Sequence, residues 1–139
     1  MPELVRFGVS MDAELLAAFD GLIGRKGYAN RSEAIRDLVR DRLVQTDWDE
    51  GEGPAAAALC LVYDHHIPEL SSRLTRIQHD YADSIVSTLH VHLTHRDCLE
   101  VIILKGKPRQ LQELADRLIA TRGVKHGRLV TSTTGQGLA

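Results

Sequence analysis

The sequence contains only two cysteines, Cys60 and Cys98, and only 4% aromatic residues. Two isolated cysteines make no disulfide framework, which argues against a small secreted domain held together by disulfides. No apolar run approaches the roughly 20 residues that a membrane span requires, and the first residues lack the basic and then apolar order of a signal peptide. We therefore expect a cytoplasmic protein without a membrane partner.

The formal net charge is −2, and hydrophobic residues make up 43% of the chain. This composition is typical of a folded protein rather than a disordered tail. The near-neutral balance provides no broad basic surface, so any contact with nucleic acid would use a small local patch. The sequence shows no Ser-His-Asp arrangement and no glycine-rich loop for a nucleotide. We therefore predict no enzyme activity and no small-molecule substrate.

The most informative stretch runs from Leu89 to Cys98 and begins with alternating apolar and polar residues. Such alternation predicts a strand, with His90 and His92 together on its polar face and about 7 Å apart. The polar residues that follow are expected to turn the chain, so that Cys98 returns toward the two imidazoles. Two imidazoles and a thiolate are three of the four donors of a typical zinc, copper or nickel site. The alternative is two solvated histidines and a cysteine that packs as a small apolar side chain.

Residues 1–45 are predicted to form one unit, made of a short strand and two helices. Alternation over residues 5–10 predicts the strand, Asp12 is a cap for the first helix, and Asn30 with Glu33 resembles a capping box for the second. A lone strand has an unpaired edge, so we expect a homodimer whose two copies form an antiparallel ribbon. Such a ribbon fits the major groove of DNA, and the N-terminus of the second helix suits a phosphate.

An acidic segment marked by glycine and proline, residues 46–54, is predicted to link this unit to a second one, residues 55–139. The only tryptophan, Trp48, is placed to dock this linker onto a neighbouring element. The second unit shows the order βαββαβ of the ferredoxin-like split arrangement, which predicts an α+β fold with one sheet face left for a partner. Its predicted elements are Ala55–Tyr63, Pro68–His79, Ile85–Thr94, Cys98–Leu104, Pro108–Arg122 and Val124–Thr133.

Two motifs give the chain a family resemblance. The segments Val5–Ser10 and Gly27–Asp37, the second containing Arg-Ser-Glu-Ala-Ile-Arg, resemble a ribbon-helix-helix DNA-binding domain. With an ACT-like second domain and the segment Thr88–Glu100, the chain resembles the NikR family of nickel-responsive transcriptional regulators over nearly its whole length. The resemblance implies a homotetramer, built as a dimer of dimers, that represses nickel-uptake genes by binding a palindromic operator in double-stranded DNA.

The resemblance also implies a ligand set. It assigns one Ni(II) per subunit to His90, His92 and Cys98 together with His79 from another subunit. Glu100 is a candidate acceptor that orients a ligand histidine, the alternative being an exposed strand carboxylate. Gly8 departs from the family, where a longer side chain commonly reaches a base edge. The predicted DNA-binding residues are Arg6, Gly8, Ser10, Asn30, Arg31 and Ser32.

A second cation site is implied at Glu33 and Asp37, which share one helix face at positions i and i+4. The resemblance suggests K⁺ or a second, weaker metal ion there. The alternative is that these carboxylates are solvated or are paired with Arg36 and Arg40.

His65 and His66 are adjacent, so as extended residues they are expected to point apart at the surface. Ile67-Pro68 follows where some family members carry basic residues that contact DNA, which argues against that contact here. Two competing functions fit the sequence less well. One is a metal-storage or metal-delivery protein whose first domain only dimerises. The other is a small hydrolase that uses the metal as a Lewis acid, although four protein ligands would leave no open coordination position.

Overall fold

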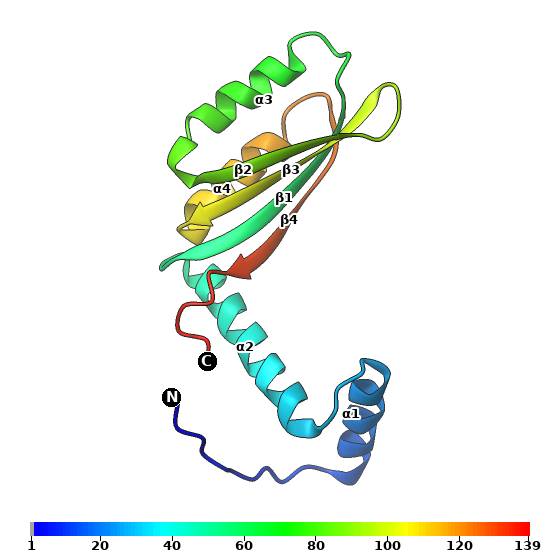
Figure 1. The fold of residues 1–139 in the computed structure, drawn as a ribbon, viewed down its shortest axis with the longest axis vertical. Helices are drawn as coiled ribbons and strands as arrows, with labels where there is room; N and C mark the ends of the chain where they lie inside the picture. The colour runs from blue at the N-terminus through cyan, green and yellow to red at the C-terminus, as the bar shows by residue number, and fades with distance from the viewer. Residues whose placement is uncertain (1) are drawn as a thin grey trace. The chain divides into compact units, whose positions relative to one another are not determined.

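The computed structural model describes residues 2–139 and divides into two compact units. The first comprises Met1–Leu43 with Gly137–Ala139, and the second comprises Val44–Gln136. Figure 1 shows helices in the first unit and a sheet with helices in the second. The predicted α+β class is confirmed, with two helices in the N-terminal unit and a four-stranded sheet with helices in the second.

The first unit contains α1 (Ala13–Arg25) and most of α2 (Arg31–Glu50). Both predicted caps are present. The Asp12 carboxylate accepts a hydrogen bond from the Glu14 amide at 2.9 Å, and the Asn30 side chain accepts one from the Glu33 amide at 2.9 Å. Each cap satisfies one of the amides that have no partner in the first turn of a helix.

Residues 2–12 form neither helix nor strand, so the strand predicted over residues 5–10 is absent from the single chain. A strand is defined by a hydrogen-bonded neighbour, and no segment within residues 2–139 pairs with this one. Val5 and Phe7 are each 75% exposed, which leaves the apolar side of the segment uncovered. This is the state expected of a strand whose partner belongs to another copy.

The second unit follows the predicted order βαββαβ, with a short 3-10 helix added before its second strand. The elements are β1 (Ala55–Asp64), α3 (Leu70–His79), η1 (Ala82–Ser84), β2 (Ile85–His92), β3 (Asp97–Gly106), α4 (Pro108–Ile119) and β4 (Val124–Thr133). The four strands form one antiparallel sheet in the order β2-β3-β1-β4. Compared with the prediction, α4 ends three residues earlier and β2 ends two residues earlier.

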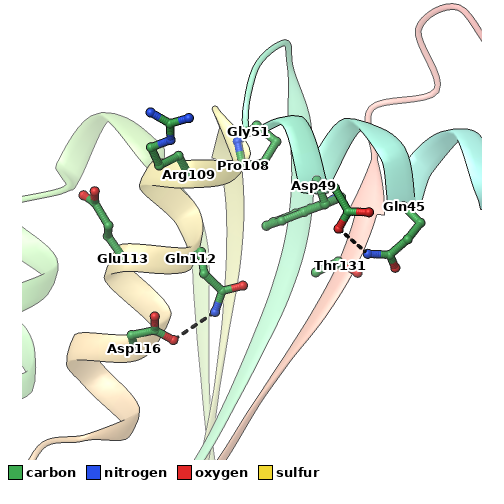
Figure 2. Close-up of a pocket in the computed structure, with 10 residues that line it drawn as sticks. Gln45, Asp49, Gly51, Pro108, Arg109, Gln112, Glu113, Asp116 and Thr131 are labelled. Atoms are coloured by element: carbon green, nitrogen blue, oxygen red, sulfur yellow. Dashed lines mark hydrogen bonds between the residues drawn. The ribbon is translucent and has the colours of Figure 1, made fainter.

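The acidic segment is only partly a linker, because α2 continues through Glu50. The prediction of an irregular segment over residues 46–54 is therefore wrong for its first five residues. The helix stops at Gly51, whose φ of 73° favours glycine. Trp48 docks as expected, since its indole N–H donates to the Ser132 carbonyl at 2.9 Å. Figure 2 shows the shallow pocket of about 350 Å³ that the end of α2 and the start of α4 line.

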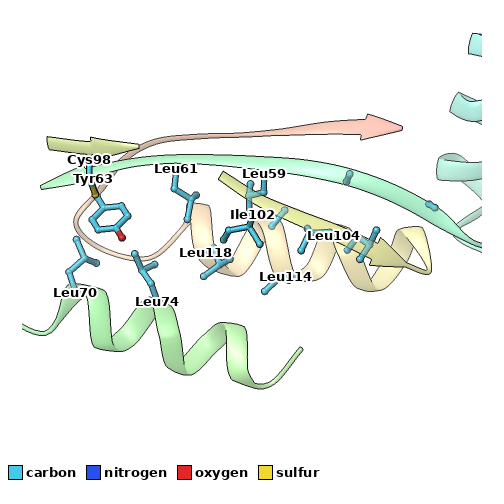
Figure 3. Close-up of a cluster of buried hydrophobic side chains, with 14 residues drawn as sticks. Leu59, Leu61, Tyr63, Leu70, Leu74, Cys98, Ile102, Leu104, Leu114 and Leu118 are labelled. Atoms are coloured by element: carbon cyan, nitrogen blue, oxygen red, sulfur yellow. The ribbon is translucent and has the colours of Figure 1, made fainter. Parts of the chain in front are cut away.

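The core lies between one face of the sheet and the helices α3 and α4, which Figure 3 shows on the same side of the strands. Every second residue of β1 from Ala55 to Tyr63 is buried, as period-two alternation requires. The buried partners from the two helices are all leucines or alanine apart from one proline. They are Leu70, Leu74, Pro108, Leu111, Leu114, Ala115 and Leu118.

Among the described residues of the second unit, no helix covers the opposite face of the sheet, which remains apolar. Leu89 is 59% exposed, Val91 39%, Ile103 39% and Val130 54%. Cross-strand register places these side chains opposite the buried set, because neighbouring residues of a strand point to opposite faces. The sheet therefore presents an open apolar face, defined here by these four residues.

None of the helices within residues 2–139 is long and apolar enough to cross a membrane.

Candidate metal centre

The hairpin of β2 and β3 brings the predicted ligands onto one face of the sheet. His92 is the cross-strand partner of Cys98, and His90 is the partner of Glu100. Cross-strand partners point to the same face, and Cys98 is only 3% exposed on the helix side. The return of the thiol toward the two imidazoles is therefore present, with both histidines more exposed because β2 is an edge strand.

A buried carboxylate orients His90. Glu100 is 4% exposed, so the alternative of an exposed strand carboxylate is wrong. Its Oε1 lies 2.8 Å from Nε2 of His90 and 3.4 Å from the Gln78 amide nitrogen, and its Oε2 accepts from the Tyr63 hydroxyl at 3.2 Å. Nε2 of His90 is thus held by the carboxylate, and if His90 binds a metal, Nδ1 is the ring nitrogen left for it.

Tyr63 lies beside Cys98 as well, since the two are cross-strand partners on β1 and β3. Burial raises the pKa of the Cys98 thiol, and the carboxylates of Glu100, Asp97 and Asp64 raise it further, while a hydrogen bond with Tyr63 lowers it. Burial is also the main cause that raises the pKa of Tyr63. The site therefore holds a protonated thiol that must lose its proton before it can bind a metal.

Within residues 2–139, no three His, Cys, Asp or Glu side chains already surround one point as a metal site requires. The fourth predicted ligand is also directed elsewhere. His79 is exposed at the C-terminal end of α3 and lines a surface hollow with Ser71, Ser72, Thr75 and Arg76. Its neighbour Gln78 is the α3 side chain that contacts Glu100. One chain thus brings His90, His92 and Cys98 to one face but keeps its own His79 apart from them.

The predicted cation site at Glu33 and Asp37 is occupied by internal pairs. Glu33 pairs with Arg36, and Asp37 accepts from Arg40 at 3.1 Å and from the Tyr28 hydroxyl at 2.7 Å. The alternative of arginine pairing is the arrangement observed. A site for K⁺ or a weaker metal stays a prediction, and a cation there would compete with these two arginines.

The predicted DNA-binding residues are all exposed. Arg6, Gly8 and Ser10 lie in the extended N-terminal segment, and Asn30 caps α2. Arg31 is already paired, because its guanidinium donates two hydrogen bonds of 2.8 Å to Asp20. These bonds lower the pKa of Asp20. A phosphate at Arg31 would therefore compete with Asp20.

The expectation that His65 and His66 point apart is wrong, because these residues lie in the turn after β1 rather than in an extended strand. Their ring centroids are 4.2 Å apart. His65 also contacts the ring of His92 at 5.1 Å, and His66 contacts the ring of His95 at 5.2 Å.

Sequence reasoning missed Tyr63 and Gln78. Alternation in β1 places Tyr63 on the core face, but it gives no sign that its hydroxyl lies beside Cys98 and Glu100. Gln78 precedes a predicted ligand, and only the packing of α3 shows that it faces Glu100.

Two family descriptions match the chain. "NikR C terminal nickel binding domain" matches residues 56–132, and "Ribbon-helix-helix protein, copG family" matches residues 5–46. Among solved structures, the uncharacterized protein TM1266 from Thermotoga maritima matches with a TM-score of 0.51 at 14% identity, covering 57% of this chain and 98% of that one. At that identity the likeness concerns the fold alone.

Curated relatives match along the whole chain. A protein of Desulfovibrio desulfuricans is 58% identical over 139 residues and covers 100% of both chains. Proteins of Geobacter sp. strain M21 and Nitratidesulfovibrio vulgaris strain DP4 are 56% and 55% identical over 138 residues, with 99% of each chain covered. All three carry the name "Putative nickel-responsive regulator".

Proposed function

The chain belongs to the NikR family of nickel-responsive regulators, and from this premise we propose that it represses nickel-uptake genes when Ni(II) is bound between its subunits. Members of this family regulate transcription and are not enzymes. The proposed ligands are His90, His92 and Cys98 of one subunit and His79 of another. The proposed compartment is the cytoplasm.

The orientation of α3 is the observation that carries the shared site. Gln78 contacts Glu100 beside the ligands of its own chain, whereas His79 faces outward with the exposed side chains of α3. A helix turns by about 100° per residue, so the two side chains cannot both face the same point. An outward His79 is available to a second copy, and His90, His92 and Cys98 lack a fourth donor without one.

The donor types suit the proposed metal. Three imidazoles and one thiolate accept Ni(II), Cu(II) or Zn(II), and a planar set favours the first two. The hydrogen bond between Glu100 and Nε2 of His90 leaves one ring nitrogen free, as ligand histidines require. Bound Ni(II) would supply a bond between chains that holds two domains in one mutual placement.

Two uncovered surfaces support the proposed tetramer. The N-terminal segment leaves Val5, Phe7 and Val9 exposed, which suits pairing of two segments as an antiparallel ribbon. The open apolar face of the sheet, Leu89, Val91, Ile103 and Val130, suits a second contact between copies. Two separate contacts of this kind generate a dimer of dimers.

The proposed DNA contacts follow from the ribbon. Arg6, Gly8 and Ser10 alternate with the apolar residues, so a paired ribbon would carry them together on its outer side and into the major groove. Asn30 and Ser32 lie at the start of α2, where free backbone amides suit a phosphate. Two ribbons in one tetramer would read two half-sites of a palindrome.

The test is a selection of random duplex DNA by the full chain, with and without Ni(II). We expect enrichment of a palindromic site only with Ni(II). His79→Ala should abolish this enrichment and weaken nickel binding, whereas His126→Ala, which removes another exposed histidine, should change neither. Unchanged nickel binding and DNA selection in His79→Ala would refute the shared site.

The metal-storage alternative predicts a different pattern. It requires nickel binding without any preferred DNA sequence. Arg6→Ala separates the two functions, because it should abolish sequence preference and leave nickel affinity at the wild-type value. A wild-type chain that binds nickel and enriches no site would favour storage or delivery.

A further inference from the structure

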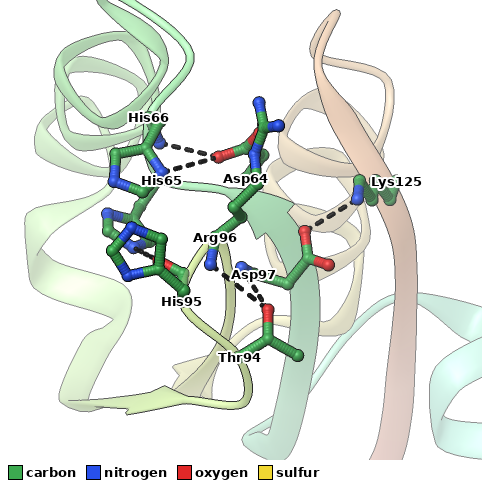
Figure 4. A network of polar contacts seen from close by, with 8 residues as sticks. All are labelled: Asp64, His65, His66, Thr94, His95, Arg96, Asp97 and Lys125. Atoms are coloured by element: carbon green, nitrogen blue, oxygen red, sulfur yellow. Dashed lines mark hydrogen bonds and ion pairs between the residues drawn. The ribbon is translucent and has the colours of Figure 1, made fainter.

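Residues 64–66, at the end of β1, contact the hairpin turn formed by residues 93–96 between β2 and β3 (Figure 4). We call these two segments the β1 corner and the ligand turn. The His65 amide donates to the Arg96 carbonyl at 3.0 Å, and Nε2 of His65 lies 3.0 Å from the His95 carbonyl. The Arg96 guanidinium donates to Oδ2 of Asp64 at 3.2 Å and 3.1 Å. Four polar contacts thus join the two segments, and the rings of His66 and His95 also contact each other across them.

The anchor of this arrangement is Asp64. Its residue is 7% exposed, and its carboxylate also accepts the His66 amide at 2.8 Å. That bond, with a further contribution from Arg96, lowers the pKa of Asp64. The carboxylate is therefore ionised at neutral pH and is available to fix Arg96.

The ligand turn is also ordered internally and from its other side. The Thr94 hydroxyl accepts the amides of Arg96 at 3.2 Å and Asp97 at 2.9 Å. Lys125 of β4 donates to the Asp97 carboxylate at 2.7 Å. The turn is consequently tied to β1, and Asp97, the β3 residue that directly follows it, is tied to β4.

The position of this turn matters because it joins the two ligand strands. His92 is the last residue of β2, and its cross-strand partner Cys98 is the second residue of β3. The ring of His65 also lies against the ring of His92. A short edge hairpin twists readily when nothing restrains it, and such twisting would change how the imidazole and the thiolate face each other.

We propose that Asp64 and Arg96 are positioning residues that hold the ligand turn, fix His92 relative to Cys98, and thereby favour metals that accept a planar donor set over Zn(II). This inference rests on the proposed function of the site. Zn(II) has no geometric preference from its d electrons and accepts the tetrahedral arrangement that a relaxed hairpin permits. Loosening the turn should therefore weaken Ni(II) binding more than Zn(II) binding.

The test uses the full chain carrying Arg96→Gln or Asp64→Asn. Lys107→Gln is the matched control, because it also removes one cation and one ion pair, that with Glu52 at 3.9 Å, away from the hairpin. Arg96→Lys keeps the charge but loses the paired N–H groups. Circular dichroism checks that each variant is folded, and chelator competition measures the Ni(II) and Zn(II) affinities.

In the metal-free protein, we expect faster amide exchange at His65 in Arg96→Gln and Asp64→Asn. The ratio of Ni(II) to Zn(II) affinity should fall about tenfold in both, the usual size of an effect from residues around the ligands. The affinity ratio of Arg96→Lys should lie between those of these two variants and the wild type. The ratio of Lys107→Gln should match the wild type. Faster exchange with a ratio within twofold of wild type would show a merely structural role and overturn the proposal. A wild-type chain that does not bind Ni(II) would instead overturn the proposed function itself.

Discussion

The contact between Glu100 and His90 makes the sharpest prediction, which is tested by Glu100→Gln. This substitution keeps the size of the side chain but removes its charge. The Glu100 carboxylate is 4% exposed and accepts from Nε2 of His90 at 2.8 Å and from Tyr63 at 3.2 Å. A neutral amide oxygen can still accept from His90, but it no longer strengthens the donor character of the opposite ring nitrogen.

The expected loss follows from the kind of contact removed. Changing a group that orients a ligand histidine usually costs about 10-fold to 100-fold in metal affinity, which corresponds to roughly 1.4–2.8 kcal/mol. His90 is 56% exposed on its other side, so water replaces part of the lost interaction. We therefore expect the effect of Glu100→Gln in the lower half of that range.

The assay is chelator competition for Ni(II) at constant pH, followed by absorption of the thiolate-to-nickel band. Glu113→Gln is the control, because it removes the same charge from an exposed position on α4. Melting of the metal-free proteins shows that each remains folded. Wild-type nickel affinity in Glu100→Gln, within twofold, would show that Glu100 does not orient a ligand and would refute the assignment of Nδ1 as the metal donor.

Three further predictions concern packing, assembly and pH. Gly127→Ala places a Cβ in a steric clash with Cγ1 of Ile119, so denaturant unfolding should show a loss of about 1–3 kcal/mol in the free energy of unfolding; no loss would show that Ile119 moves freely. Leu89→Lys and Ile103→Lys together put charges on the open apolar face, so sedimentation should show a smaller assembly than that of the wild type; an unchanged mass would show that the contact between copies lies elsewhere. Because burial raises the pKa of Cys98, nickel affinity should rise at least about tenfold per pH unit from pH 6 to 8 as the thiol loses its proton; equal affinity across this range would exclude the thiolate as a ligand.

Local sequence patterns were sufficient to predict the helices and strands of the second unit. Period-two alternation in β1 and period-3.6 leucines in α4 specify strand and helix because each pattern places its apolar side chains on one face. The helix caps at Asp12 and Asn30 could also be predicted from the sequence, because a cap depends only on the first turn of its own helix. The end of α2 could not be predicted from the acidic composition of residues 46–54, because Asp and Glu are compatible with a helix and only Gly51 stops it.

The N-terminal strand shows the limit of local patterns. Its alternation is present in the sequence, yet the segment forms no strand in one chain, because the hydrogen bonds that define a strand come from a neighbour. Its state depends on a partner rather than on its own residues.

The sequence by itself determined the order of elements, the hairpin that carries His90, His92 and Cys98, and the family to which the chain belongs, because these depend on patterns within short segments. Only the tertiary structure decided that Glu100 is buried against His90, that Tyr63 lies beside Cys98, and that α3 directs Gln78 inward and His79 outward. Those facts depend on cross-strand register and on the rotation of a packed helix, which bring together residues that are far apart in the chain.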